Sequence, residues 1–137
     1  MRKILFYAMG GENMCFNHVL MNALDLNEAG YEVKIVFEGQ AVKLPPVLEE
    51  KKDAMYLEAK EKNLLAGVCQ ACATMLGVLD GVKETGLPLL NDMRGHAGIK
   101  PFAEEGYEVI EFYRMTTRER FLNEAIQHDI LMADIMR

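Results

Sequence analysis

The chain has little positive charge and no long hydrophobic run. Its 15 lysines and arginines are outnumbered by 21 aspartates and glutamates, which gives a formal net charge of -6. This balance argues against a general nucleic-acid or anionic-membrane surface, because both require clustered basic side chains. The apolar run Ile4–Met9 is too short for a signal peptide or a membrane span, and Glu12 follows it closely. We therefore expect neither a nucleic-acid nor a membrane partner.

Cysteine is scarce and tryptophan is absent. Three cysteines in a chain without a secretory signal indicate reduced thiols rather than a disulfide framework, so we expect a cytoplasmic protein. Half of the residues are hydrophobic and 26% are charged, which excludes disorder as the overall description. At 137 residues the chain has the length of one domain, and we treat residues 1–137 as a single domain.

Strands and helices alternate in the predicted secondary structure. The apolar run Lys3–Met9 predicts a strand, and the glycines after it predict a turn. Apolar residues then recur at helical spacing from Phe16 to Leu26, and a helix stop signal follows at Gly30. Tyr31–Phe37 is rich in β-branched residues and predicts a second strand. This β-α-β unit implies parallel pairing and a right-handed crossover.

The same alternation continues to the end of the chain. The further expected strands are Leu64–Val68, Leu87–Asn91 and Tyr107–Phe112. The further expected helices are a charged surface helix at Val47–Lys62 after a Pro45-Pro46 connection, a helix at Ala71–Leu79, a short helix at Ile99–Glu105 and an amphipathic helix at Thr116–Arg137. The pattern predicts the α/β class, with a three-layer α/β/α sandwich around a mostly parallel five-stranded sheet. The terminal helix needs a surface to cover, and a second subunit is a candidate.

Cys69 and Cys72 form a CxxC motif directly after the predicted third strand. A helix that begins here would hold Cys69 near its N-terminus, where free N–H groups and the helix dipole favour the thiolate. A thiolate can act as a nucleophile, a metal ligand or half of a disulfide. The alternative is structural, because free cysteines often pack as small buried hydrophobic side chains. The tryptophan and proline typical of a thioredoxin CxxC are missing, which argues against that class of oxidoreductase.

Several polar or glycine-rich positions are predicted to reach the same edge of the sheet. Sites in parallel α/β sheets form at the carboxyl ends of strands, beside the point where the strand order reverses. Gly10 and Gly11 follow the first strand and Glu38 follows the second. The two glycines match neither GxGxxG nor a P-loop, so a tight turn is their simpler role. If the first and third strands are neighbours, Cys15 approaches the CxxC thiols.

His96 lies in a loop that also contains two glycines and an arginine, Arg94–Gly98. This loop could bind an anion or assist thiolate formation at Cys69, or it could be an ordinary turn. A zinc site would need the CxxC and two further ligands, which Cys15 with His18 or His96 would supply. The chain contains no second pair of ligands at regular spacing, which argues against zinc.

Four segments carry a resemblance to a known family. They are the opening strand Ile4–Tyr7, the stretch Val36–Gly39 with Ala41 and Val42, the segment Val68–Cys72, and the closing Gly106–Phe112. In this order and spacing the chain resembles the DsrE-like family of small sulfur-relay proteins, which includes the Tus-type sulfurtransferase subunits. The resemblance covers a core of roughly residues 3–112, and the helical extension of about 116–137 departs from the usual compact core.

The resemblance implies a function for the CxxC. It implies that Cys69 carries a persulfide, and that the protein is a homo-oligomer, a trimer or a hexamer, with cysteines near subunit interfaces. The first hypothesis is therefore a sulfur carrier or sulfurtransferase in which Cys72 or Cys15 discharges or protects the persulfide, with a protein as sulfur donor or acceptor and no metal or organic cofactor. The alternatives are a non-catalytic oligomeric binding module with structural thiols, and a thiol redox or zinc sensor that uses Cys15, Cys69 and Cys72.

Overall fold

The computed structural model describes residues 1–112 of the chain. The predicted terminal helix at 116–137 lies outside the described residues. The strands are β1 (Lys3–Ala8), β2 (Glu32–Phe37), β3 (Leu65–Cys69), β4 (Leu89–Leu90) and β5 (Tyr107–Phe112). The helices are α1 (Asn13–Glu28), the 3-10 helix η1 (Gly39–Lys43), α2 (Leu44–Glu50), α3 (Ala54–Glu61), α4 (Gln70–Met75), α5 (Leu79–Thr85) and α6 (Lys100–Glu104).

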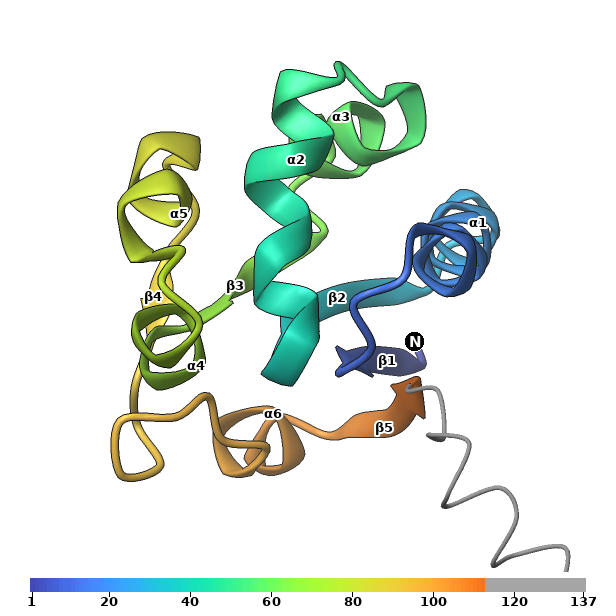
Figure 1. Cartoon of the computed structure of the whole chain (residues 1–137). Coiled ribbons are helices and arrows are strands. Elements are labelled where there is room, and N and C mark those ends of the chain that lie inside the picture. The colour runs from blue at the N-terminus through green and yellow to red at the C-terminus, as the bar shows by residue number, and fades with distance from the viewer. Residues whose placement is uncertain (113–137) are drawn as a thin grey trace, which may run out of the picture.

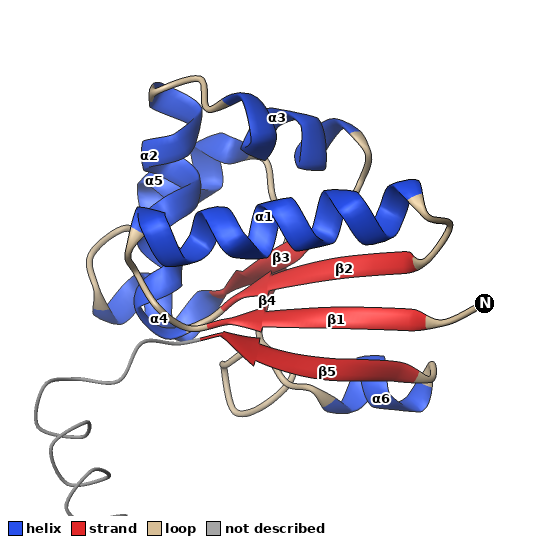
Figure 2. Ribbon diagram, turned by 90° about the vertical axis from the view of Figure 1, so that its right-hand side faces the viewer, coloured by secondary structure: helices blue, strands red, loops and turns tan. Residues whose placement is uncertain are grey.

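The five strands form one all-parallel sheet in the order β4-β3-β2-β1-β5 (Figure 1). Figure 2 shows α1, α2 and α3 on one side of the strands and α6 on the other. The prediction of a three-layer α/β/α sandwich with a five-stranded parallel sheet is therefore confirmed. No helix within residues 1–112 is long and apolar enough to cross a membrane.

The core forms where α1 packs on the central strands. The buried face of α1 consists of Phe16, Val19, Leu20 and Ala23, spaced as one side of a helix requires. Residues 4–8 of β1 are all buried, because a central parallel strand is covered on both faces. The Phe16 and Phe37 rings pack with their centroids 5.1 Å apart, which joins the first turns of α1 to the end of β2.

One predicted helix is broken into two, and another is shorter than expected. The predicted surface helix at Val47–Lys62 is wrong, because α2 ends at Glu50 and α3 begins at Ala54. Lys52 adopts a φ of 55° between them, and the Asp53 carboxylate accepts the Tyr56 N–H at 3.0 Å as the N-cap of α3. These helices also bury side chains, including Leu48 and Tyr56.

The other difference lies after the CxxC. The predicted helix at Ala71–Leu79 is too long, because α4 ends at Met75 and the chain turns at Gly77 with a φ of 72°. The helix α5, which begins at Leu79, was not predicted. The proline pair that was expected in a connection lies instead at the first turn of α2, where proline is well tolerated. The fourth strand is only Leu89–Leu90, shorter than the predicted Leu87–Asn91.

Candidate functional site

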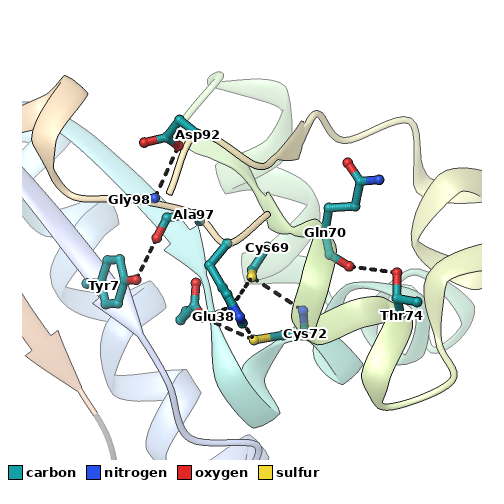
Figure 3. A network of polar contacts seen from close by, with 10 residues as sticks. Tyr7, Glu38, Cys69, Gln70, Cys72, Thr74, Asp92, Ala97 and Gly98 are labelled. Carbon is teal, nitrogen blue, oxygen red and sulfur yellow. Dashed lines mark hydrogen bonds and ion pairs between the residues drawn. The ribbon is translucent and has the colours of Figure 1, made fainter. Parts of the chain in front are cut away.

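Four polar side chains meet at the carboxyl edge of the sheet (Figure 3). Glu38 directly follows β2, Cys69 ends β3, Cys72 lies in α4, and His96 lies in the loop between β4 and α6. One ligand atom from each lies within 4.8 Å of the others. We call these four residues the thiol cluster. It forms because parallel strands deliver their carboxyl ends to one edge, as expected for this class of sheet.

Cys69 is the most enclosed member of the thiol cluster. It is fully buried, and it is the N-cap of α4, where its Sγ accepts the Cys72 N–H at 3.4 Å. Its Sγ also lies 3.3 Å from the His96 Nδ1. An N–H at a helix start and a neighbouring imidazole are both found around cysteines that act as nucleophiles. The prediction that a strand delivers Cys69 to a helix start is confirmed.

Cys72 faces a carboxylate instead. Its Sγ donates a hydrogen bond to the Glu38 Oε1 at 3.0 Å and lies 3.5 Å from the His96 Nδ1. Burial, together with the hydrogen bonds to Glu38 and Cys69, raises the pKa of Cys72 to about 12, while the Gly39 backbone opposes this rise. Cys72 is therefore a protonated thiol in this arrangement, and the two cysteines of the motif differ in character.

Glu38 is a buried carboxylate with an incomplete set of partners. Its side chain is 8% exposed, and its Oε1 lies 3.3 Å from the His96 Nδ1. Its Oε2 accepts no hydrogen bond within residues 1–112. Gly39, with a φ of +55°, turns the chain immediately after it, and a Cβ there would lie 3.2 Å from the Met9 carbonyl oxygen. Burial of an acidic group with an unpaired oxygen lowers the stability of the fold, so Glu38 is a candidate for a functional role.

A short hydrogen-bonded loop positions His96. The backbones of Met93 and His96 pair reciprocally at 2.9 Å, and the Ala71 N–H donates to the Gly95 carbonyl at 3.0 Å. A side-chain bond of 2.9 Å also joins this loop to α4, from the Asn91 Nδ2 to the Gln70 Oε1. The loop is thus fastened to the helix that carries the CxxC, which holds the imidazole over both thiols.

Tyr7 contacts the loop that carries His96, and this role was not predicted from the sequence. Its hydroxyl donates to the Ala97 carbonyl at 2.7 Å, next to His96 in the chain (Figure 3). Burial raises the pKa of Tyr7, and the charge of Glu38 raises it further. The available signal was a hydroxyl-bearing residue near the end of a buried strand, where a polar group needs a partner.

The predicted site residues have different outcomes. Cys69, Cys72, Glu38 and His96 come together, whereas Cys15 is half-buried on α1 and is not part of the thiol cluster. The expectation that brought it there is wrong, because β2 lies between β1 and β3. The strand order reverses at β1, so the cluster at β2 and β3 lies beside that point rather than at it.

The glycine turn after β1 has a structural role. A Cβ on Gly11 would lie 3.0 Å from both the Cβ and the carbonyl oxygen of Gln40, so the turn packs closely against η1. Gly10 precedes it at the same carboxyl edge. Neither glycine supplies a side chain to the thiol cluster, and the pair shapes the neighbouring wall of the edge.

The fold and site define a small parallel α/β protein with a cysteine, histidine and glutamate cluster at the strand ends. The chain is 36% identical over 94 residues to the uncharacterized protein MJ0733 of Methanocaldococcus jannaschii, an alignment that spans 69% of this chain and 77% of that protein. The chain therefore belongs to the family of that archaeal protein. A second similar protein, uncharacterized and from Archaeoglobus fulgidus, is 34% identical over 44 residues, which span 32% of this chain and 72% of that protein.

A solved structure shares the fold. It is a conserved protein of unknown function, BT1422 from Bacteroides thetaiotaomicron, with a TM-score of 0.61 and 20% sequence identity. The match covers 80% of this chain and 94% of that chain. At this level of identity it supports the architecture alone. No protein-family model matches the chain.

Proposed function

We propose that this protein carries sulfane sulfur as a persulfide on Cys69. The observation that carries the proposal is the pairing of the buried Cys69 Sγ with the His96 Nδ1 at 3.3 Å, at the start of α4. A cysteine at a helix start beside an imidazole is the common arrangement of a nucleophilic thiol. The resemblance to DsrE-like sulfur-relay proteins points to the same residue.

The two cysteines take different roles in this proposal. Cys72 has a pKa raised to about 12 and donates a hydrogen bond to Glu38, so it stays a neutral thiol at physiological pH. Cys69 accepts the Cys72 N–H and contacts His96, which makes it the sulfur that attacks. The His96 side chain is 36% exposed, so the donor approaches Cys69 past the imidazole.

Loading is a transfer of one sulfur atom between thiolates. The Cys69 thiolate attacks the outer sulfur of a persulfide donor, the S–S bond of the donor breaks, and a new S–S bond forms on Cys69. The donor leaves as a thiolate, so no external oxidant or reductant is needed. Transfer onward repeats the step with an acceptor thiolate, which takes the outer sulfur and leaves Cys69 as a thiolate.

Cys72 offers a second way to discharge the persulfide. Its Sγ lies in the same cluster, and as its proton passes to the Glu38 carboxylate it can attack the inner sulfur of Cys69. A Cys69–Cys72 disulfide forms, the persulfide S–S bond breaks, and the outer sulfur leaves as hydrosulfide, which takes up that proton. A cellular dithiol then reduces this disulfide back to two thiols. Cys15 lies outside the thiol cluster and takes no part.

The proposal extends to the setting of the protein. We propose a cytoplasmic homo-oligomer, a trimer or hexamer, that exchanges sulfur with a protein partner, and light scattering of the full chain tests the oligomeric state.

The complete burial of Cys69 favours one competing function, a non-catalytic binding module whose thiols only pack. Slow alkylation of both cluster cysteines in the native protein, together with no sulfur loading, would support that alternative.

The direct test is sulfur loading of matched cysteine variants. We expect Cys69→Ser to lose loading by at least about tenfold, because a serine hydroxyl is a far weaker nucleophile at neutral pH. Cys15→Ser is the matched control, since it removes a half-buried thiol outside the cluster and should load like the wild type. Peptide mapping after incubation with a persulfide donor provides the readout. Undiminished loading in Cys69→Ser would contradict the proposal.

A further inference from the structure

The His96 imidazole is surrounded by more partners than one nitrogen can serve. Its Nδ1 lies 3.3 Å from the Cys69 Sγ, 3.5 Å from the Cys72 Sγ and 3.3 Å from the Glu38 Oε1. A ring nitrogen carries either one hydrogen or one lone pair, so it can complete only one of these three contacts well. Three close neighbours around one nitrogen are instead what a shared cation would produce.

Four of the six distances among these atoms are 3.0–3.5 Å, close to the edges of a tetrahedron around zinc, and all six lie within 4.8 Å. Zinc bonds of about 2.3 Å to sulfur and about 2.0–2.2 Å to nitrogen or oxygen place neighbouring ligand atoms about 3.4–3.8 Å apart. The three contacts of Nδ1 range from 3.3 to 3.5 Å. The shortest edge is the 3.0 Å contact of Cys72 with Glu38, which a thiol proton bridges and which lengthens when zinc replaces that proton.

The buried carboxylate supplies an independent observation. Glu38 is 6% exposed, and its Oε2 has no hydrogen-bond partner within residues 1–112. Its other oxygen contacts the Cys72 thiol and His96. A buried carboxylate of this kind is normally paired or bound to a metal, because an uncompensated buried charge is very costly. A divalent cation at the centre of the thiol cluster would compensate it.

We propose that Glu38, Cys69, Cys72 and His96 bind one zinc ion. Two thiolates, an imidazole and a carboxylate form a soft, mixed N/O/S set that suits zinc and is poor for magnesium or calcium. Binding forms two Zn–S bonds, one Zn–N bond and one Zn–O bond, and it releases the proton of Cys72 and any proton that Cys69 holds. The sequence argued against zinc, and of the further ligands that it offered beside the CxxC, only His96 is a member, while Cys15 and His18 are not.

The zinc site stands on its own geometry, while its consequence for sulfur transfer rests on the proposed function. A zinc-bound Cys69 sulfur shares one of its lone pairs with the metal, which lowers its nucleophilicity toward a persulfide donor. Zinc and sulfane sulfur therefore compete for the same thiolates. We expect one equivalent of zinc to lower the rate of sulfur loading at least about tenfold, and a chelator to restore it.

The first experiment titrates zinc into the chelator-treated full chain in competition with a chromophoric chelator. We expect one zinc per chain, and a loss of affinity of at least about 100-fold in Cys72→Ser and His96→Gln. Glu38→Gln should lose at least about tenfold. The matched controls are Cys15→Ser and His18→Gln, which remove the same side-chain types outside the cluster and should bind as the wild type does. Wild-type affinity in Cys72→Ser and His96→Gln would overturn the site.

The second experiment uses the wild-type chain, so it does not depend on whether variants fold. Cobalt(II) added to chelator-treated protein should give the intense visible bands of a tetrahedral site and a thiolate charge-transfer band. Zinc should also protect Cys69 and Cys72 from alkylation, while Cys15 in the same molecule reacts at an unchanged rate. Weak octahedral cobalt bands, or equal reactivity of the cluster cysteines with and without zinc, would overturn the proposal.

The zinc, cobalt and alkylation measurements use protein that has not been exposed to a sulfur donor. Sulfur loading is measured separately, on chelator-treated protein. A zinc site without loading would leave the metal inference intact and reject the sulfur carrier. Sulfur loading without zinc binding would support the sulfur carrier and reject the zinc site.

Discussion

Individual side chains outside the thiol cluster determine where its members lie. The Tyr7 hydroxyl holds the Ala97 carbonyl at 2.7 Å, and Ala97 is the residue after His96. The Asp92 carboxylate accepts the Gly98 N–H at 3.1 Å on the other side of the same loop. These two hydrogen bonds to nearby residues of the loop add to the contacts that His96 itself makes, and so help to position the imidazole.

Removal of the Tyr7 hydroxyl should loosen that loop. Tyr7→Phe keeps the buried ring but leaves the Ala97 carbonyl without its donor, which should lower the free energy of unfolding by about 1–2 kcal/mol. Urea denaturation measures the change. Tyr31→Phe is the control, because Tyr31 is half-buried and its ring, which lies under Arg2, is retained. Equal losses of unfolding free energy in the two variants would show that the Tyr7 hydrogen bond does not stabilise the loop.

At the scale of elements, a close approach between β3 and β4 positions Cys69. The Val68 N–H donates to the Pro88 carbonyl at 2.9 Å, and β4 pairs with only the last two residues of β3. A Cβ on Gly67 would lie 2.7 Å from the Pro88 carbonyl oxygen and from the Leu90 Cγ. Glycine is therefore required at this position if the short edge strand is to pair at all.

A methyl group at Gly67 should separate the two strands. We expect Gly67→Ala to lower the free energy of unfolding by about 1–3 kcal/mol through overpacking, and to speed alkylation of Cys69 at the end of β3. Gly81→Ala in α5 is the control, because the nearest atoms to its new Cβ, on Pro46, lie 3.3 Å away. Thermal unfolding and timed alkylation provide the readouts. A Gly67→Ala protein as stable as Gly81→Ala would contradict the close approach.

The elements also show what local sequence can predict. The start of β5 at Tyr107 and the position of Cys69 at a strand-to-helix junction followed from apolar runs bounded by glycines or polar residues. The break at Lys52 did not, because a non-glycine residue with positive φ leaves no compositional signal. The strand order did not either, since parallel pairing depends on long-range packing that no local pattern encodes. That is why Cys15 was placed wrongly while Glu38 and His96 were predicted at the correct edge.

At the scale of the whole molecule, three tyrosines with raised pKa values make the stability of the fold depend on alkaline pH. Burial raises the pKa of Tyr107 to about 12, with the charge of Glu32 as the next cause. Burial also raises the pKa of Tyr7, where Glu38 adds to it, and of Tyr56, where Glu49 adds to it. These tyrosines lie on β1, α3 and β5, so their ionisation reports on three different elements of the fold.

Their ionisation should accompany unfolding. A pKa raised in the folded state means that the folded chain favours the protonated phenol, so its contribution to stability is complete below the ordinary tyrosine pKa of about 10. That contribution is lost as the pH rises toward about 12. Tyrosinate absorbance and circular dichroism, followed together as pH is raised, should show part of the signal of the five tyrosines appearing only as the fold is lost. Complete ionisation near pH 10 with an intact fold would contradict this expectation.

The most direct test of the sulfur-carrier account is intact-mass spectrometry of the chelator-treated wild-type chain after exposure to a persulfide donor, followed by peptide mapping of its three cysteines. The account predicts a gain of one sulfur atom that maps to Cys69 and is removed by a thiol acceptor. A sulfur adduct on Cys15 alone, or no adduct with Cys69 also inert to alkylation, would contradict it.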